Sequence, residues 1–171
     1  MSDSLRDRLE VVFKDISSEV DVDGRLTVHA NPASVLSVLG FLKDDGYDYL
    51  VLVSCIDWID EGALEVVYVL SRYLDPADTD GGRVPMLLKT RVPRESPVLA
   101  SSIEIFPVAE PHEREIHELF GIRFYGHPRL TPLFLEREYE VPPFRKDFDT
   151  RQYVEEVFGN VPPVGEGTQA L

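Results

Sequence analysis

A nearly continuous apolar run between residues 47 and 59 constrains the fold more than any other feature of the sequence. Such a run is typical of a strand covered on both faces, so we predict a central strand here. Residues 60–62 predict a turn, and the alternating side chains of residues 64–71 predict a partner strand. The longest apolar stretch, residues 49–56, is far shorter than the ~20 residues that span a bilayer, so no membrane helix is expected.

Apolar residues at helical spacing predict two helices before this run. A hairpin with strands over residues 18–22 and 25–30 is expected between them. The second helix should begin at Asn31-Pro32 and end at Gly46, with its apolar stripe between them. The first helix should begin near Ser4, and its stripe comprises Leu5, Leu9, Val12, Phe13 and Ile16.

Beyond the partner strand, we predict a flexible loop over residues 75–82, a third strand over 84–92, and short helices over 96–106 and 111–120. This order of elements predicts an α+β protein, namely a two-layer domain of helices on a mixed β-sheet with an irregular C-terminal extension.

The C-terminal part of the sequence differs from the rest. From residue 122 it is rich in Pro, Gly and aromatic residues, and it lacks a pattern that would bury its apolar groups within itself. Long irregular segments of this kind are usually functional or lie on a partner. We therefore assign residues 1–125 to the α+β domain, 126–159 to a partner-wrapping extension, and 160–171 to a flexible tail.

Composition excludes several classes of function. The formal net charge of −14 at pH 7 argues against binding to nucleic acid or an anionic bilayer, because both require clustered Lys and Arg. An iron–sulfur cluster normally needs about four Cys ligands, and this sequence holds only Cys55, which we expect to be a buried thiol. The first residues have no apolar segment typical of a signal peptide, so a cytoplasmic protein is expected.

The sequence HEREIHELFG invites comparison with zinc-protease helices, in which two His four residues apart share one face. His112 and His117 are five residues apart, roughly 140° around a helix, so they cannot bind one metal ion together. A charged docking helix is one interpretation, and the alternative, which spacing alone favours, is a solvated helix face with pairs of charges four residues apart. Glu110, Arg114 and Glu118 are four residues apart and are expected to stack, with the guanidinium between two carboxylates.

Two sequence blocks resemble the signature of a known family. The blocks EREIHELFGIRFYGHPRL (residues 113–130) and PPFRKDF (residues 142–148) are similar to the 30-kDa subunit of respiratory complex I, the NADH–quinone oxidoreductase of respiratory chains. The resemblance extends over about residues 50–150. It departs from the family pattern at Glu118, where Asp is usual, and at Thr131, where Arg is common.

The resemblance implies a subunit without an active site of its own, so no catalytic, cofactor-binding or metal-binding residues are expected. Subunits of this family pack against a 49-kDa subunit, a relative of the large subunit of nickel–iron hydrogenases, with iron–sulfur subunits adjacent. The chain would thus lie on the inner face of the cell membrane and support assembly of an electron-transferring, ion-translocating complex. The residues expected at the partner interface are Glu113, Arg114, Glu115, Phe120, Gly126, His127, Pro128, Arg145, Lys146, Asp147 and Phe148.

Three alternatives remain open at this point. Membrane-bound hydrogenases, F420H2 dehydrogenases and ferredoxin-linked complexes use homologous subunits, and a chain without an NADH site does not reveal its complex's electron donor. A stand-alone metal-dependent hydrolase would use His112, His117 and Asp57. A free-standing interaction domain would retain the fold without the complex.

Overall fold

Alternating apolar residues place a five-stranded sheet at the centre of the fold. The computed structural model describes residues 2–72, 85–135 and 139–159. In chain order, the elements are α1 (Ser2–Val12), β1 (Ile16–Val20), β2 (Leu26–Ala30), α2 (Val35–Asp44), β3 (Tyr49–Trp58), the short 3-10 helix η1 (Ile59–Glu61), β4 (Ala63–Ser71), β5 (Met86–Pro93), β6 (Val98–Ala100), α3 (Ala109–Phe120), β7 (Arg123–Tyr125) and α4 (Thr150–Phe158).

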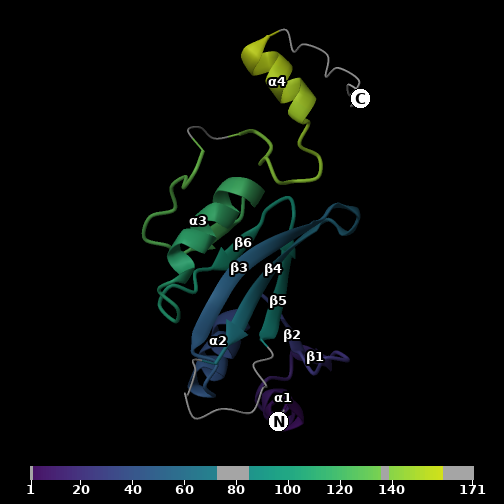
Figure 1. The fold of residues 1–171 in the computed structure, drawn as a ribbon, viewed down its shortest axis with the longest axis vertical. Helices are drawn as coiled ribbons and strands as arrows, with labels where there is room; N and C mark the ends of the chain where they lie inside the picture. Colours follow the sequence, from purple (N-terminus) through teal and green to yellow (C-terminus); the bar gives the residue numbers. More distant parts are fainter. Residues whose placement is uncertain (1, 73–84, 136–138, 160–171) are drawn as a thin grey trace, which may run out of the picture.

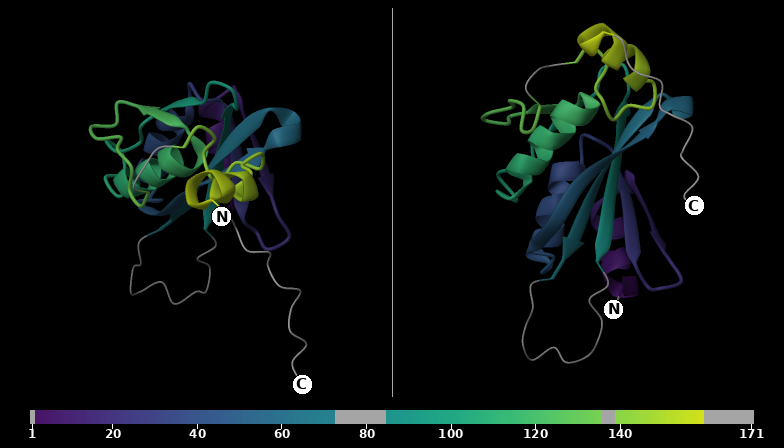
Figure 2. Two further views of the ribbon diagram at one scale, coloured as in Figure 1. Left: turned by 90° about the horizontal axis from the view of Figure 1, so that it is seen from above. Right: turned by 45° about the horizontal axis from the view of Figure 1, so that its top comes forward.

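The sheet is mixed, as predicted. Its strand order is β1-β2-β5-β4-β3, in which β2 and β5 run parallel and every other neighbouring pair is antiparallel. The strands β6 and β7 form a separate parallel pair. Figures 1 and 2 show the sheet twisting between α1 at one end of the molecule and α4 at the other.

One face of the sheet carries the core. Tyr68 of β4 lies between Val53 of β3 and Leu88 of β5, and all three are almost fully buried. The same core contains Leu9 of α1 and Ile116 of α3, as well as four residues of α2. The helices therefore form one layer and the sheet the other, which confirms the predicted two-layer α+β architecture.

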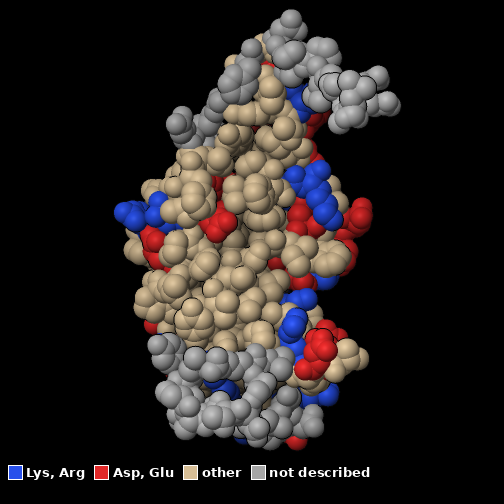
Figure 3. Space-filling model, in the orientation of Figure 1, with Lys and Arg blue, Asp and Glu red and all other residues tan. Residues whose placement is uncertain are grey.

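The opposite face of the sheet carries both apolar and charged side chains. Arg91 of β5 pairs with Glu65 at 2.7 Å and with Glu61 at 2.5 Å, and its guanidinium also lies over the Trp58 ring. Lys89 lies 3.6 Å from Glu65. Figure 3 shows a broad uncharged area across the middle of the view, with charged side chains gathered along its right side.

The prediction of a central strand over residues 47–59 is wrong in position. The segment forms β3, which stands at the end of the strand order, and Leu52 and Ile56 on its outer face are 37% and 39% exposed. A continuous apolar run indicates cover on both faces. Here the helices of the described part of the chain cover one face, so alternate apolar residues reach the surface.

The predicted helix over residues 96–106 is also wrong. Residues 98–100 form β6, and a turn follows in which the Phe106 N–H donates to the Ser102 carbonyl. Pro97 favours an extended residue before it, and Pro107 lacks a backbone N–H, so the two prolines discourage a helix.

Smaller differences occur at element ends. Ile16, predicted on the first helix, begins β1, and the N-cap of α2 is Ser34 rather than Asn31. The extension, predicted to be irregular throughout, contains α4. The predicted loop over residues 75–82, Val84, and the tail over 160–171 lie outside the described residues.

No helix in the described ranges has both the length and the apolar character that crossing a membrane requires.

Candidate partner-binding surface

Glu113, expected at a partner interface, lies inside the chain's own core. Its side chain is fully buried on α3, and its carboxylate accepts hydrogen bonds from the Ser101 hydroxyl at 2.6 Å and from the Ser102 N–H and hydroxyl at 2.7 Å each. Burial and the nearby Glu113 charge raise the pKa of Tyr68. Glu113 thus fixes α3 against the turn after β6 and presents no atom to the surface.

The outward face of α3 holds the extension through its backbone. Arg114 donates to the Thr131 carbonyl at 3.0 Å and to the Pro132 carbonyl at 2.8 Å. One turn later, Glu118 accepts the N–H groups of Leu133 at 3.1 Å, of Phe134 at 3.0 Å, and of Leu135. An irregular backbone cannot pair with itself, so these two side chains supply its partners.

The predicted stack of three charged residues on α3 forms only in part. Arg114 lies 3.5 Å from Glu110, but Glu118 faces the backbone of the extension instead. Glu110 also pairs with Arg129 at 3.3 Å. The spacing correctly predicts that the three residues share one helical face. The backbone of the extension, however, binds Arg114 and Glu118 in addition to or in place of the predicted charge pairs.

The C-terminal end of α3 forms a second contact with the extension. The last carbonyls of a helix lack intrahelical donors. Here the Phe144 N–H donates to the Leu119 carbonyl at 3.0 Å, and Arg145 Nε donates to the Phe120 carbonyl at 2.7 Å. The Phe120 and Phe144 rings meet edge to face at 5.9 Å. Gly121, with φ of +81°, gives the chain the left-handed residue that ends the helix.

A charged cluster at the ends of β3 and β5 makes the third contact. Arg94 donates to both carboxylate oxygens of Asp57, at 2.8 and 3.0 Å, and to both of Asp147, at 3.1 and 2.5 Å. The Lys146 N–H donates to Asp57 at 2.8 Å. Side-chain exposure is 1% for Asp57 and 14% for Arg94, so the pair that these two form is largely removed from water, whereas the Asp147 side chain is 44% exposed.

The charged cluster sets a pH dependence. Hydrogen bonds from Arg94 lower the pKa of both Asp57 and Asp147. A lowered folded-state pKa contributes stability that is complete above the ordinary value of about 3.9 and is lost as the pH falls through the folded value. We expect carboxyl carbon NMR titration to give midpoints below about 3.9 for both residues, and midpoints at or above that value would contradict the arrangement.

The remaining expected interface residues lie at or near the surface. His127 Nε2 lies 3.3 Å from the Glu110 carbonyl oxygen, and Gly126 and Pro128 beside it are exposed. Glu115 is partly exposed on α3, and Lys146 has an exposed side chain.

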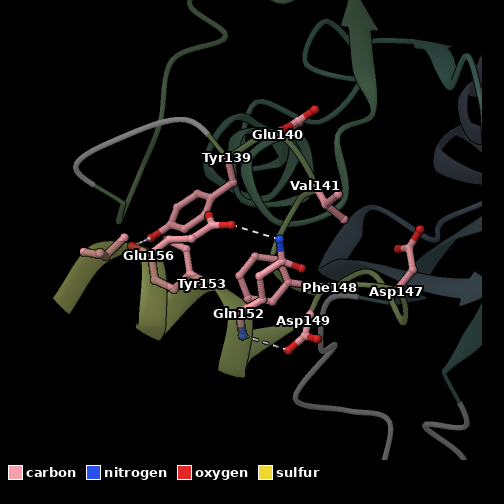
Figure 4. A pocket seen from close by; sticks show the side chains of 10 residues that line it. Tyr139, Glu140, Val141, Asp147, Phe148, Asp149, Gln152, Tyr153 and Glu156 are labelled. Carbon is pink, nitrogen blue, oxygen red and sulfur yellow. Dashed lines mark hydrogen bonds between the residues drawn. The ribbon is translucent and has the colours of Figure 1, made fainter. Parts of the chain in front are cut away.

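Phe148 belongs to an aromatic cluster of three rings. Its centroid is 5.9 Å from Tyr139 and 5.7 Å from Tyr153 of α4. Figure 4 shows these rings gathered between α4 and the extension. The cluster packs α4 against the rest of the extension.

Three aromatic side chains near α3 point away from the core. Tyr125 of β7 is 80% exposed, Phe134 is 67% exposed and Phe144 is 60% exposed. The Phe134 N–H donates to Glu118, and the Phe144 N–H donates to a carbonyl at the C-terminal end of α3. Tyr and Phe are enriched at protein interfaces. The three contacts with the domain therefore hold the extension in a position in which Phe134 and Phe144 face outward, as Tyr125 does on β7.

Two residues of the hydrolase alternative, His117 and Asp57, are held in other roles. His117 Nδ1 lies 2.8 Å from the Ile122 carbonyl oxygen, and Asp57 is held by Arg94 and the Lys146 N–H. Within residues 2–72, 85–135 and 139–159, no three His, Cys, Asp or Glu side chains are placed to hold a metal ion. Burial raises the pKa of Cys55 to about 12, so its thiol stays protonated at neutral pH, and its predicted burial is confirmed.

Sequence reasoning did not assign Arg94 or the ring of Tyr153 to this surface, and it assigned Glu118 to the docking helix without its backbone partners in the extension. Arg94 pairs with residues 37 and 53 positions away, which no local pattern reveals. For α4 a signal was present. Asp149 caps the helix by accepting the N–H groups of Arg151 and Gln152, and Asp followed by spaced apolar residues is a readable helix start.

Comparisons with known proteins agree on one family. Residues 28–154 match the family model described as "Respiratory-chain NADH dehydrogenase, 30 Kd subunit". One relative, which belongs to the NADH-quinone oxidoreductase of Roseiflexus castenholzii, is 33% identical over 145 residues, which cover 82% of this chain and 79% of the relative. Another, which belongs to the F(420)H(2) dehydrogenase of Methanosarcina mazei, is 33% identical over 141 residues, covering 80% of this chain and 85% of the relative.

Two solved structures share the fold. The trypsin-resistant fragment of Nqo5 superposes with a TM-score of 0.62 at 27% identity, covering 76% of this chain and all of the fragment. A chain of the membrane-bound sulfane sulfur reductase, an archaeal respiratory membrane complex, superposes with a TM-score of 0.81 at 22% identity and covers 99% of this chain and 98% of that one. The second likeness therefore extends over the C-terminal extension.

Proposed function

Because the chain belongs to the family of the 30-kDa subunit of respiratory-chain NADH dehydrogenase, we propose that it is a non-catalytic subunit of a complex I-type NADH–quinone oxidoreductase. In this role it docks on a 49-kDa-like subunit, beside iron–sulfur subunits, and supports assembly of the electron-transfer complex. It carries no cofactor of its own. Through its complex it lies peripherally on the inner face of the cell membrane.

The exposed aromatic side chains support docking more than any other observation. Tyr125, Phe134 and Phe144 are more than half exposed, although their neighbours on β7 and the extension are anchored by hydrogen bonds. An anchored backbone has already lost most of its conformational freedom, so little further entropy is lost when a partner covers these rings. Such pre-ordered aromatic residues are typical of interface hot spots.

The chemistry of the charged groups supports a role without catalysis. Asp57 accepts hydrogen bonds from Arg94 and a backbone N–H, and Glu118 accepts three backbone N–H groups. Carboxylates that are paired in this way are engaged in contacts within the chain, which favours a structural role for them. Their positions hold the docking surface in shape.

Replacement of Phe134 by alanine tests the proposal. The intact complex purified from native membranes should contain the wild-type chain, and the Phe134→Ala chain should be retained at least about tenfold less well, as expected for loss of a hot-spot ring. The free energy of unfolding of the isolated variant should change by less than about 0.5 kcal/mol, because the ring is mostly exposed. Quantitative mass spectrometry of the complex and urea unfolding give the two readouts.

Val22→Ala is the matched control, because Val22 is a fully exposed apolar residue at the hairpin between β1 and β2. It should leave both readouts unchanged. Failure of the wild-type chain to co-purify with a 49-kDa-like subunit would refute the proposal. If the complex retains the Phe134→Ala chain as well as the wild-type chain, Phe134 does not contribute to the docking surface.

Equivalent subunits of other complexes form the second candidate. The relative from Methanosarcina mazei belongs to an F(420)H(2) dehydrogenase and is as similar in identity as the Roseiflexus castenholzii protein. The same purification separates the candidates. A co-purified NADH-oxidising subunit supports the first, and an F420H2-oxidising subunit or a nickel–iron hydrogenase large subunit supports the second.

A further inference from the structure

A groove of about 340 Å³ lies between α4 and the extension (Figure 4). The groove combines aromatic rings with acidic side chains, and none of the lining residues that the structure describes is Lys or Arg. Its lining is formed by Tyr139, Glu140, Val141, Asp147, Phe148, Asp149, Gln152, Tyr153, Glu156 and Val157.

The three rings of the groove form a closed triangle. Tyr139 and Tyr153 are 5.1 Å apart between centroids, and Phe148 lies 5.9 and 5.7 Å from them. The hydroxyls of Tyr139 and Tyr153 are 3.2 Å apart, which fixes their relative orientation. All three rings are partly exposed, so ring surface remains open to the groove. Aromatic faces attract cations, and more strongly when water is excluded.

The carboxylates of the groove differ in how they are paired. Asp147 is held by Arg94, and Asp149 accepts two backbone N–H groups of α4 through Oδ1. Glu156 Oε1 accepts a bond from Gln152, a neutral side chain. Glu140 and Glu156 are both exposed, and among the described residues neither has a cationic partner.

The position of α4 leaves it with little packing of its own. Figure 1 shows α4 at the end of the molecule, apart from the sheet and the other helices. A helix of nine residues is marginal in water without packing. A partner side chain in the groove would bury the ring cluster further and fix α4 in place.

We infer that this groove receives an arginine side chain from the partner subunit on which the chain docks, an inference that rests on the proposed function. A guanidinium is planar, so it can stack on an aromatic ring while its N–H groups reach a nearby carboxylate. Arginine therefore fits better than the compact ammonium of lysine. The chain's net charge of −14 complements such a basic partner segment.

Charge reversal in the purified complex tests the inference. In the Glu140→Lys/Glu156→Lys chain, retention in the complex should fall at least about tenfold and should be lost at lower salt than in wild type. Glu104→Lys is the matched control, because Glu104 is an exposed carboxylate in the turn before α3. It should behave like wild type. Far-UV circular dichroism verifies that the double variant retains its helices.

A photo-crosslink identifies the occupant directly. Benzoylphenylalanine placed at the position of Gln152, on the groove wall, should couple in the intact complex to another subunit. The coupled peptide should contain an arginine. A peptide without arginine, a second copy of this chain, or the absence of any product would overturn the inference, as would a double variant retained as well as Glu104→Lys.

The two proposals fail in different ways. If the wild-type chain does not co-purify with a partner subunit, the proposed function fails. If the wild type co-purifies and the groove variants match the control, docking stands and the arginine site is wrong.

Discussion

The Glu113→Ala variant should lose more than about 3 kcal/mol of unfolding free energy. The substitution leaves the partly buried Ser101 hydroxyl and the fully buried N–H and hydroxyl of Ser102 without their acceptor. Each buried donor left unpaired costs about 1–3 kcal/mol, and the vacated volume adds to this. Urea unfolding followed by circular dichroism gives the value.

Two further substitutions test this explanation. Glu113→Gln keeps one acceptor oxygen, and a serine hydroxyl can rotate to accept from the new amide, so a loss of only about 1–2 kcal/mol is expected. Glu115→Ala, two residues along α3 on a partly exposed side chain, should stay within about 0.5 kcal/mol of wild type. A loss below about 1 kcal/mol in Glu113→Ala would show that the carboxylate does not support the core.

The Arg94→Ala variant should release the extension from the domain. Its removal leaves the carboxylate of Asp57, which is almost fully buried, with one backbone donor, and it unpairs Asp147. Breaking a buried ion pair from one side costs about 3–5 kcal/mol. The fraction of molecules with a detached extension should therefore rise at least about hundredfold, because 1.36 kcal/mol corresponds to a factor of ten.

Limited trypsin digestion measures this release, because cleavage of a transiently opened segment follows its open population. The rate of cleavage after Arg145 and Lys146 should rise in proportion to the fraction of molecules with a detached extension. Arg91→Ala is the control, since Arg91 pairs with Glu61 and Glu65 on the open face of the sheet. It should change cleavage at these two bonds far less. Similar acceleration in both variants would indicate global destabilisation in place of a local release.

Most of the helical layer was predictable from the sequence, because helix periodicity is a local property. Leu5 and Leu9 of α1 and the stripe of α2 through Val38 and Leu42 are buried as predicted, whereas Val12, also predicted on the stripe of α1, is 55% exposed. The helix α3 ends before Gly121, whose positive φ required a residue without a side chain. In each case the residues that decide the structure lie within one or two turns of each other.

The position of strands was less predictable than their existence. The apolar run of β3 predicted a strand correctly and its place in the sheet wrongly, because strand order depends on pairings between distant segments. The same holds for the partner-binding surface. The two sequence blocks indicate the family, but the inward orientation of Glu113 depends on Ser101 and Ser102, for which the sequence predicts a helix.

The order of strands also bears on how the chain is made. The hairpins β1–β2 and β3–β4 pair neighbours in sequence, whereas β5 lies between β2 and β4, with Thr27 beside Leu87. Local pairings form fast, and parallel pairing across a long loop is slow. During synthesis from the N-terminus, both hairpins are made before β5, so the edges of β2 and β4 that pair with β5 stay unpaired until then. The sheet is therefore complete only when β5 pairs with both hairpins, and this pairing joins them into a single cooperative unit.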